Sequence, residues 1–183
     1  MNGTLLVRAK GRVARDADLV HAQLHYYVRP GCLELVNALR EQPGVRLAFY
    51  TSMQRRNAVP IIEHLFGAGC LSGPAAFGLY DRSYNVEDSS GANSWDTMRD
   101  LTRIWSEAGS VGHGFSELDT VMVDDTPRKM RHLPHNAVIV PEYDEAATLE
   151  VRSYKPDAPG PLRQPAPNKG SRIGTALRRC MLV

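Results

Sequence analysis

The sequence predicts an α/β fold with three layers, in which a mostly parallel sheet is flanked by helices. Short, continuously apolar segments at residues 44–52, 119–125 and 136–140 have the pattern of strands buried on both faces. Segments with helical spacing of apolar residues lie between them, and this alternation is typical of parallel sheets. At 183 residues the chain is long enough to form one domain with a substantial core.

Three helices are expected around these strands. Residues 31–42 precede the first apolar strand, and their leucines and valine recur three positions apart. Residues 56–66 form a second helical segment after that strand. Residues 94–107 form a third, with Ser94 as its N-cap and apolar side chains along one face. Active sites in such folds lie beyond the carboxyl ends of the strands.

The chain divides into a domain over residues 1–153 and a tail over 154–183. The tail contains five prolines and, from Lys155 onward, six basic residues against the single acid Asp157. Its apolar residues follow no helical or strand period, so burial of apolar surface cannot offset the entropy of ordering it. We therefore expect a flexible, basic, proline-rich tail.

Composition excludes several classes of protein. No apolar run is long enough for a membrane span, and no charged-then-apolar leader precedes the first strand. The expected location is therefore intracellular, in the nucleus or the cytoplasm. The three cysteines lack C-x-x-C spacing, which argues against a disulfide framework and a structural zinc site.

Polar side chains follow two of the predicted strands at the carboxyl edge of the sheet. Thr51 and Ser52 follow the first, and Asp124 and Asp125 end the second, before a Thr-Pro pair. Adjacent carboxylates form a hard-oxygen site suited to Mg²⁺, and nearby hydroxyls can bind a phosphate oxygen. Helix capping is the alternative role for the acidic pair, because Asp or Thr before Pro is a common helix start.

The order and spacing of three short motifs carry a family resemblance. "RPG" precedes a helix, "YTS" ends a strand, and "VDDTP" follows a later strand. With the segments around them, from about residue 2 to 144, they resemble the phosphatase domain of the RNA polymerase II C-terminal-domain phosphatases and their NLI-interacting-factor-like relatives. The resemblance implies a haloacid dehalogenase-like, Rossmannoid fold.

These phosphatases carry a D-x-D-x-T loop after their first strand, and the resemblance places "MNGTLL" on that loop. In the family the leading Asp attacks phosphorus, and the second Asp protonates the leaving group and activates water. Asn2 then falls at the acid/base position and Thr4 at the closing Thr, while the nucleophile would stand one residue before Met1. Since an amide is no general acid, the resemblance implies impaired catalysis.

The remaining site residues also follow from the resemblance. Thr51 matches the hydroxyl that binds the transferring phosphoryl group, and Arg99 stands where the family has a lysine. Asp124 matches the carboxylate that binds Mg²⁺, with Asp125 as a direct or water-mediated second ligand. An alternative for Arg99 is a solvent-facing arginine paired with a neighbouring aspartate.

The first strand of the family's sheet is largely missing from this chain. That strand is central, so losing about five buried residues removes about 10 kcal/mol of stabilisation, comparable with the stability of a whole domain. We expect a protein that starts at Met1 to fold badly unless another segment fills the slot. The accompanying hypothesis is that Met1 is internal, preceded by an apolar strand and an Asp.

Three functions are compatible with these observations. The first is a Mg²⁺-dependent Ser/Thr phosphoprotein phosphatase, impaired as given. The second is a non-catalytic pseudophosphatase that binds phosphorylated or acidic protein partners through Thr51, Arg99 and its tail. The third is a protein related to the presequence receptor of the mitochondrial inner-membrane translocase, which uses the same domain.

The partner expected from the sequence is a phosphoprotein or an acidic protein, and the protein is expected to be a monomer. Nucleic acid is not expected, because the basic tail lacks interleaved aromatic residues. Cys180 is fourth from the end and follows two arginines, which satisfies a loose lipidation pattern. Contact with a membrane is expected only if Cys180 carries a lipid.

Overall fold

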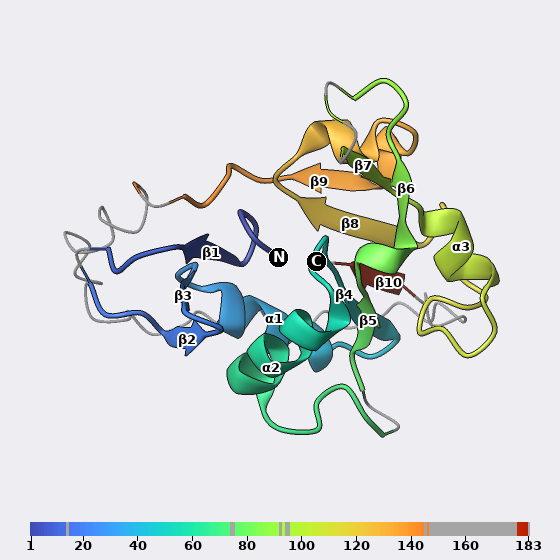
Figure 1. Ribbon diagram of the computed structural model, residues 1–183. Helices are drawn as coiled ribbons and strands as arrows, with labels where there is room; N and C mark the ends of the chain where they lie inside the picture. Colours follow the sequence, from blue (N-terminus) through green and yellow to red (C-terminus); the bar gives the residue numbers. More distant parts are fainter. Residues whose placement is uncertain are drawn as a thin grey trace, which may run out of the picture.

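A five-stranded parallel sheet forms the centre of the protein (Figure 1). The computed structural model describes residues 1–13, 15–73, 76–91, 93, 96–144, 146 and the backbone of 179–182. The order of the strands across the sheet is β5-β4-β10-β8-β9, and every neighbouring pair is parallel. The strands are β4 (Val45–Tyr50), β5 (Gly78–Tyr80), β8 (Thr120–Asp124), β9 (Ala137–Ile139) and β10 (Arg179–Leu182).

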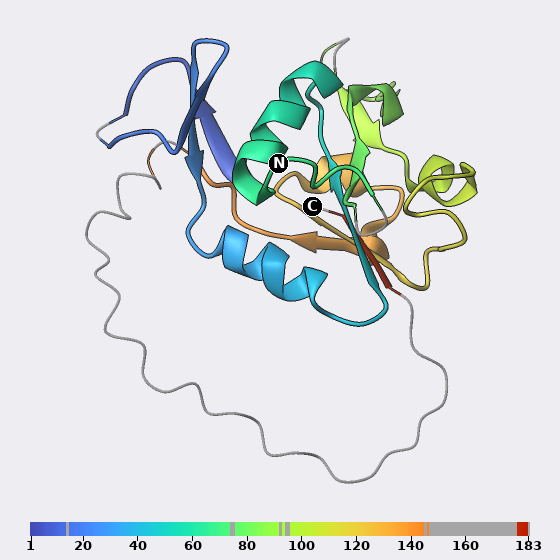
Figure 2. The same cartoon turned by 90° about the horizontal axis from the view of Figure 1, so that it is seen from below.

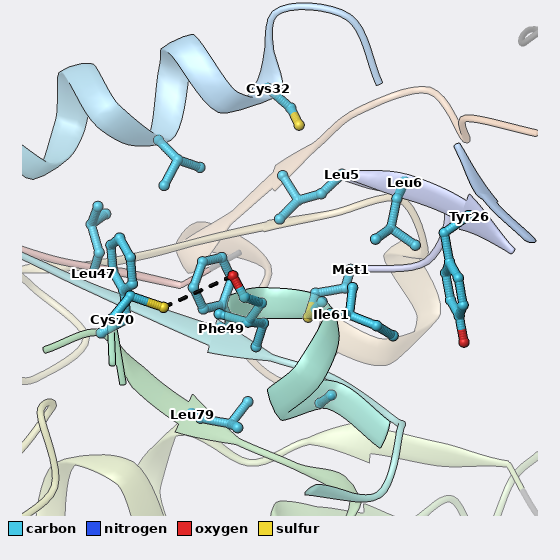
Figure 3. Close-up of a cluster of buried hydrophobic side chains, with 14 residues drawn as sticks. Met1, Leu5, Leu6, Tyr26, Cys32, Leu47, Phe49, Ile61, Cys70 and Leu79 are labelled. Carbon is cyan, nitrogen blue, oxygen red and sulfur yellow. Dashed lines mark hydrogen bonds between the residues drawn. The ribbon is translucent and has the colours of Figure 1, made fainter. Parts of the chain in front are cut away.

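The strand β4 is buried on both faces because its side chains alternate between two core clusters. Leu47 and Phe49 pack in one cluster with α1 (Cys32–Arg40) and α2 (Arg55–Phe66). Ala48 and Tyr50 pack in another with α3 (Leu101–Ser106). Figure 3 shows the first cluster, which also contains Met1. The strand and helix predictions for 44–52, 31–42 and 56–66 are confirmed.

Two antiparallel sheets flank this centre. The first has the order β1-β3-β2, formed by β1 (Leu6–Ala9), β2 (Leu19–His21) and β3 (Leu24–Val28). β2 and β3 are joined by Ala22 and Gln23, which both have the positive φ of a tight hairpin turn. The second pairs β6 (Asn85–Glu87) with β7 (Thr97–Arg99). The fold is therefore α/β, with short parallel and antiparallel sheets together.

Short 3-10 helices complete the connections. They are η1 (Arg82–Tyr84), η2 (Pro127–Met130) and η3 (Pro134–Asn136). η2 follows β8 and places Met130 in the cluster of α3. The predicted strands at 119–125 and 136–140 are confirmed as β8 and β9.

The predicted helix over 94–107 is wrong in its first half. Residues 97–99 form β7, because they pair with β6 through long-range backbone hydrogen bonds that local apolar spacing does not reveal. The helix starts only at Leu101, where the Asp100 side chain accepts a hydrogen bond from Thr102 N as an N-cap. The expected cap Ser94 lies outside the described residues.

The prediction of a flexible tail over 154–183 fails for its last part. Residues 179–182 form β10, which lies between β4 and β8 and pairs with both. Figures 1 and 2 place its carboxyl end beside the N-terminus. Average composition hides such a strand, because its stability comes from ladders with partners far away in sequence. Residues 154–178 lie outside the described part, and the domain limit at 153 stays a prediction.

Among the described residues, no helix is both long and apolar enough to cross a membrane.

Candidate functional site

The site predicted from the sequence lies at the carboxyl edge of the parallel sheet. Thr51 directly follows β4, and Asp124 ends β8. Thr51 is 2% exposed, and its backbone N–H donates to Tyr80 O at 2.9 Å. Its hydroxyl accepts a hydrogen bond from Met53 N at 3.1 Å and donates to none of the described residues. The hydroxyl proton is therefore not committed within that part of the protein.

Arg99, the last residue of β7, links the two strand ends. Its Nε donates to Asp124 Oδ2 at 3.2 Å, and both side chains are 3% exposed. Its Nη1 donates to Ser52 Oγ at 3.2 Å and to Asn85 Oδ1 at 3.1 Å. The guanidinium also lies over the Tyr50 ring, 4.7 Å from its centroid. No described residue accepts a hydrogen bond from Nη2, which leaves both N–H groups of this nitrogen for a ligand.

This geometry decides between two interpretations of Arg99. A solvent-facing arginine paired with a neighbouring aspartate is wrong, because Arg99 is buried and pairs with a carboxylate 25 residues away. The neighbouring Asp100 instead caps α3. A buried ion pair of this kind carries a desolvation cost that good geometry must offset.

The second carboxylate of the pair, Asp125, holds the loop that contains Thr4. The Thr4 hydroxyl donates to Asp125 Oδ1 at 2.6 Å, and the Thr126 hydroxyl donates to Oδ2 at 3.2 Å. Burial raises the pKa of Asp125, but the hydrogen bond from Thr4 and nearby positive charge outweigh it and lower this pKa below its ordinary value. Asp125 is therefore ionised at neutral pH.

Gly3 permits this close approach of the loop. Its φ is +82°, and a Cβ at this position would lie 2.4 Å from Asp125 Oδ2. Its carbonyl accepts hydrogen bonds from Tyr143 N at 2.7 Å and from the side chain of Arg29, the arginine of the "RPG" motif, at 3.3 Å. The motif thus helps to position the loop against the carboxylates.

Asn2 does not join this cluster. Its side chain is exposed, and its Oδ1 accepts a hydrogen bond from Arg8 N at 2.8 Å. The structure therefore brings Thr51, Arg99, Asp124 and Asp125 to one edge of the sheet and directs the amide of Asn2 to the backbone of β1.

Two groups near the carboxylates were missed in the sequence. Lys129 in η2 is partly buried, and burial, together with the charge of Arg99, lowers the pKa of its ammonium, while Asp124 and Asp125 raise it. The Met1 amino group is fully buried, and desolvation with the nearby Arg99 lowers its pKa to about 5. The sequence shows a lysine five residues after Asp124. Only the folded structure shows that this lysine lies near the carboxylates of Asp124 and Asp125.

The described donor set does not fit a Mg²⁺ site on its own. Asp124 Oδ2 accepts from Arg99, and its Oδ1 accepts from Thr126 N at 2.8 Å, so both oxygens have partners. The two oxygens of Asp125 accept from Thr4 and Thr126. Within the described ranges, no group of three or more His, Cys, Asp or Glu residues could hold a metal ion. The bond from Thr126 N also gives Asp124 a local capping role, the alternative considered for this motif.

A cavity with different lining residues lies away from this cluster. Its volume is about 940 Å³, and Val45, Arg46, the residues of β5 and parts of 107–115 line it. None of the predicted site residues is among the lining residues. The candidate site is therefore separate from this cavity.

Comparison with known protein families identifies a related family. Residues 1–154 match the family of NLI interacting factor-like phosphatases. No curated protein matches the chain. Because the match covers most of the chain and agrees with the motifs, the chain belongs to the NLI interacting factor-like phosphatase family, a family that suggests dependence on a divalent metal.

Proposed function

We propose that this member of the family is a phosphatase-like domain that binds phosphorylated serine or threonine side chains of a protein partner and hydrolyses them poorly or not at all. The observation that carries the proposal is the Arg99 guanidinium, buried at the carboxyl edge of the sheet with Nη2 uncommitted among the described residues. We also propose that the α/β fold has the three-layer, haloacid dehalogenase-like arrangement. The helices packed on both faces of β4 support this proposal.

The donors of the site suit a phosphomonoester. Arg99 Nη2 offers a charged donor, and the Thr51 hydroxyl offers a neutral one. Ser52, beside Thr51 in sequence and 3.2 Å from Arg99 Nη1, adds a second hydroxyl. Charge-assisted hydrogen bonds to phosphate oxygens are among the stronger ones in proteins. Lys129 offsets part of the negative charge of Asp124 and Asp125 that would otherwise repel the phosphate.

The same geometry argues against efficient turnover. The amide of Asn2 has no proton to transfer at neutral pH, and its oxygen is bound to Arg8 N. General acid catalysis typically contributes 10² to 10⁴ in rate. Asp124 is held by Arg99 and Thr126 N, and Asp125 by Thr4 and Thr126, so neither carboxylate is free to attack phosphorus.

Calorimetric titration tests the proposal with a phosphoserine peptide and its unphosphorylated counterpart. The phosphopeptide should bind at least about tenfold more tightly, and Arg99→Gln should remove this preference because the charged donor is lost. Arg12→Gln is the matched control, because Arg12 is an exposed arginine that pairs with Asp16 at the surface. Equal affinity for both peptides would refute the proposal.

A parallel assay separates binding from catalysis. Release of nitrophenol from p-nitrophenyl phosphate is followed in EDTA and in Mg²⁺, for the wild type and for Asp124→Asn. We expect no turnover above background in either buffer. Turnover that needs Mg²⁺ and disappears with Asp124→Asn would establish an enzyme in place of a binding domain.

A further inference from the structure

The strand β10 occupies the middle of the parallel sheet although it comes from the far end of the sequence. It is parallel to β4 on one side and to β8 on the other. No other described strand joins these two halves. Without β10 the sheet would consist of two separate pairs, β5 with β4 and β8 with β9, each with an unpaired edge.

The register of β10 aligns the two halves of the candidate site. Leu182 lies opposite Ala48 of β4 and opposite Met122 of β8. Two residues further along their strands are Tyr50, which precedes Thr51, and Asp124. Since neighbouring strands lie about 4.8 Å apart, β10 keeps β4 and β8 about 10 Å apart at a fixed level. The spacing between the Thr51 and Asp124 backbones therefore depends on this strand.

We propose that the gap between β4 and β8 is a strand-docking site whose occupant is this chain's own segment 179–182, and that docking of this segment assembles the phosphate-binding edge. The docked segment is a separable element rather than a continuation of the domain. The proposal concerns how the edge is built, and the tests of docking below do not require that the edge binds phosphate.

The sequence of the segment fits this role. Cys180, Met181 and Leu182 are apolar residue types, which is typical of strands in the middle of a parallel sheet, and two arginines precede them in the sequence. Residues 147–178 lie between residue 146 and this strand, a sequence long enough to span more than 100 Å when extended. The strand is therefore separated from the preceding described residue by 32 residues of sequence.

Release of the segment has two physical consequences. The backbone N–H and C=O groups of β4 and β8 that now pair with β10 lose their partners, which is costly for buried strands. The strands that carry Thr51 and Asp124 also lose their common register. If Cys180 carried a lipid, its attachment would require this released state, because Cys180 now pairs with Arg46 and Thr120 in the sheet.

A disulfide trap tests the docking directly. Arg46 is exposed and is the Cα partner of Cys180, so Arg46→Cys places two thiols on neighbouring strands. Arg56→Cys, at an exposed position of α2, is the matched control. Cys32 and Cys70 are buried. After mild oxidation, peptide mapping should find position 46 joined to Cys180 in most molecules and position 56 in few. Equal yields for the two variants would overturn the proposal.

Hydrogen–deuterium exchange gives a second test. Met181→Pro removes a backbone donor from the middle of the strand and should abolish docking. We expect the amides of both β4 and β8 to exchange at least tenfold faster, while β1 and β3 keep their protection. Ala158→Pro is the control within the tail, and a peptide of sequence ALRRCMLV added to a chain truncated after Leu177 should restore the protection. Unchanged exchange in β4 and β8 of Met181→Pro would contradict the proposal.

If Met181→Pro unfolds the whole chain, β1 and β3 lose protection as well. The disulfide trap then decides, because Arg46→Cys changes only an exposed side chain. Loss of phosphopeptide binding in the truncated chain, restored by the peptide, would connect docking to the proposed function. Intact docking without any phosphopeptide binding would refute the proposed function and leave the docked strand in place.

Discussion

Two clusters of arginine and aspartate lie at the two ends of the β6–β7 strand pair, and they are built differently. In the Asp88 cluster, one carboxylate accepts hydrogen bonds from Arg128, Arg131 and Ser90, and Arg128 also reaches Asp96 at 3.0 Å. In the edge cluster, one arginine, Arg99, donates hydrogen bonds to Asp124, Ser52 and Asn85.

The two clusters differ in which group is buried at the centre, a carboxylate in the first and an arginine in the second. Asp88 is 4% exposed, and its two arginine partners have side chains 40% and 33% exposed. A buried carboxylate that collects several donors from η2 and its surroundings fastens the hairpin to the loop after β8. Arg99 is itself the buried group, and one of its donors finds no acceptor among the described residues. The first cluster is suited to stabilise the fold. The second is suited both to stabilise the fold and to bind a ligand.

The largest effect is expected from Arg99→Gln, which would break the edge cluster. Loss of the cation leaves Asp124 buried without its charge partner, and breaking such a pair typically costs about 3–5 kcal/mol. Urea denaturation measures this loss. Arg99→Lys, which keeps the charge, should lose less, and equal losses for both variants would mean that geometry rather than charge matters here.

Asp88→Asn should lower the melting temperature by less than Arg99→Gln and leave the affinity for a phosphopeptide within about twofold. The hydrogen bond from Arg131, with help from Ser90 and Arg128, holds the pKa of Asp88 well below its ordinary value despite burial. The difference in melting temperature between Asp88→Asn and wild type should therefore be largest above about pH 4 and become smaller as the pH falls further. A large loss of affinity would place Asp88 in the binding site.

Thr4→Val tests the link between the N-terminal loop and Asp125. It removes the donor at 2.6 Å from Asp125 Oδ1 with little change in shape, and the expected loss of unfolding free energy is about 1–2 kcal/mol. The pKa of Asp125 is lowered in the folded protein, so this advantage of the wild type is present above about pH 4 and disappears as the pH falls. Denaturation at pH 7 and pH 3 should show a smaller difference at pH 3 than at pH 7.

The smallest effect is expected from Arg12→Gln. Arg12 pairs with Asp16 at the surface, where the two side chains are 67% and 88% exposed. Such pairs contribute at most about 0.5 kcal/mol, so urea denaturation and phosphopeptide affinity should match wild type within error. A clear loss of stability or affinity would show that the contribution of an arginine does not follow from how deeply it is buried.

Local sequence patterns predicted the elements that local forces determine. The apolar run before Thr51 formed β4, and the periodic segments on each side formed α1 and α2. Thr51 and Asp124 lie at one edge of the sheet because the carboxyl ends of parallel strands meet there, and Arg99, which stands at a position of the family motif, lies beside them. These predictions needed only the periodicity, the order of elements and the motif.

Long-range pairing explains what could not be predicted. Residues 97–99 have helical spacing but pair with β6, and residues 179–182 end a proline-rich tail but pair with β4 and β8. The orientation of Asn2 depends on a hydrogen bond from Arg8 N, and the position of Lys129 depends on how η2 folds back over the edge. No local pattern contains these contacts.

The most direct test of the account is a titration with a phosphoserine peptide followed by ¹H–¹⁵N NMR. The account predicts that the Arg99 Nε–H and Thr51 N–H signals shift with saturation, while the side chains of Arg128 and Arg131 do not. Saturable shifts confined to Arg128 and Arg131, or the same shifts at Arg99 with the unphosphorylated peptide, would contradict the claim that the edge cluster is the phosphate site.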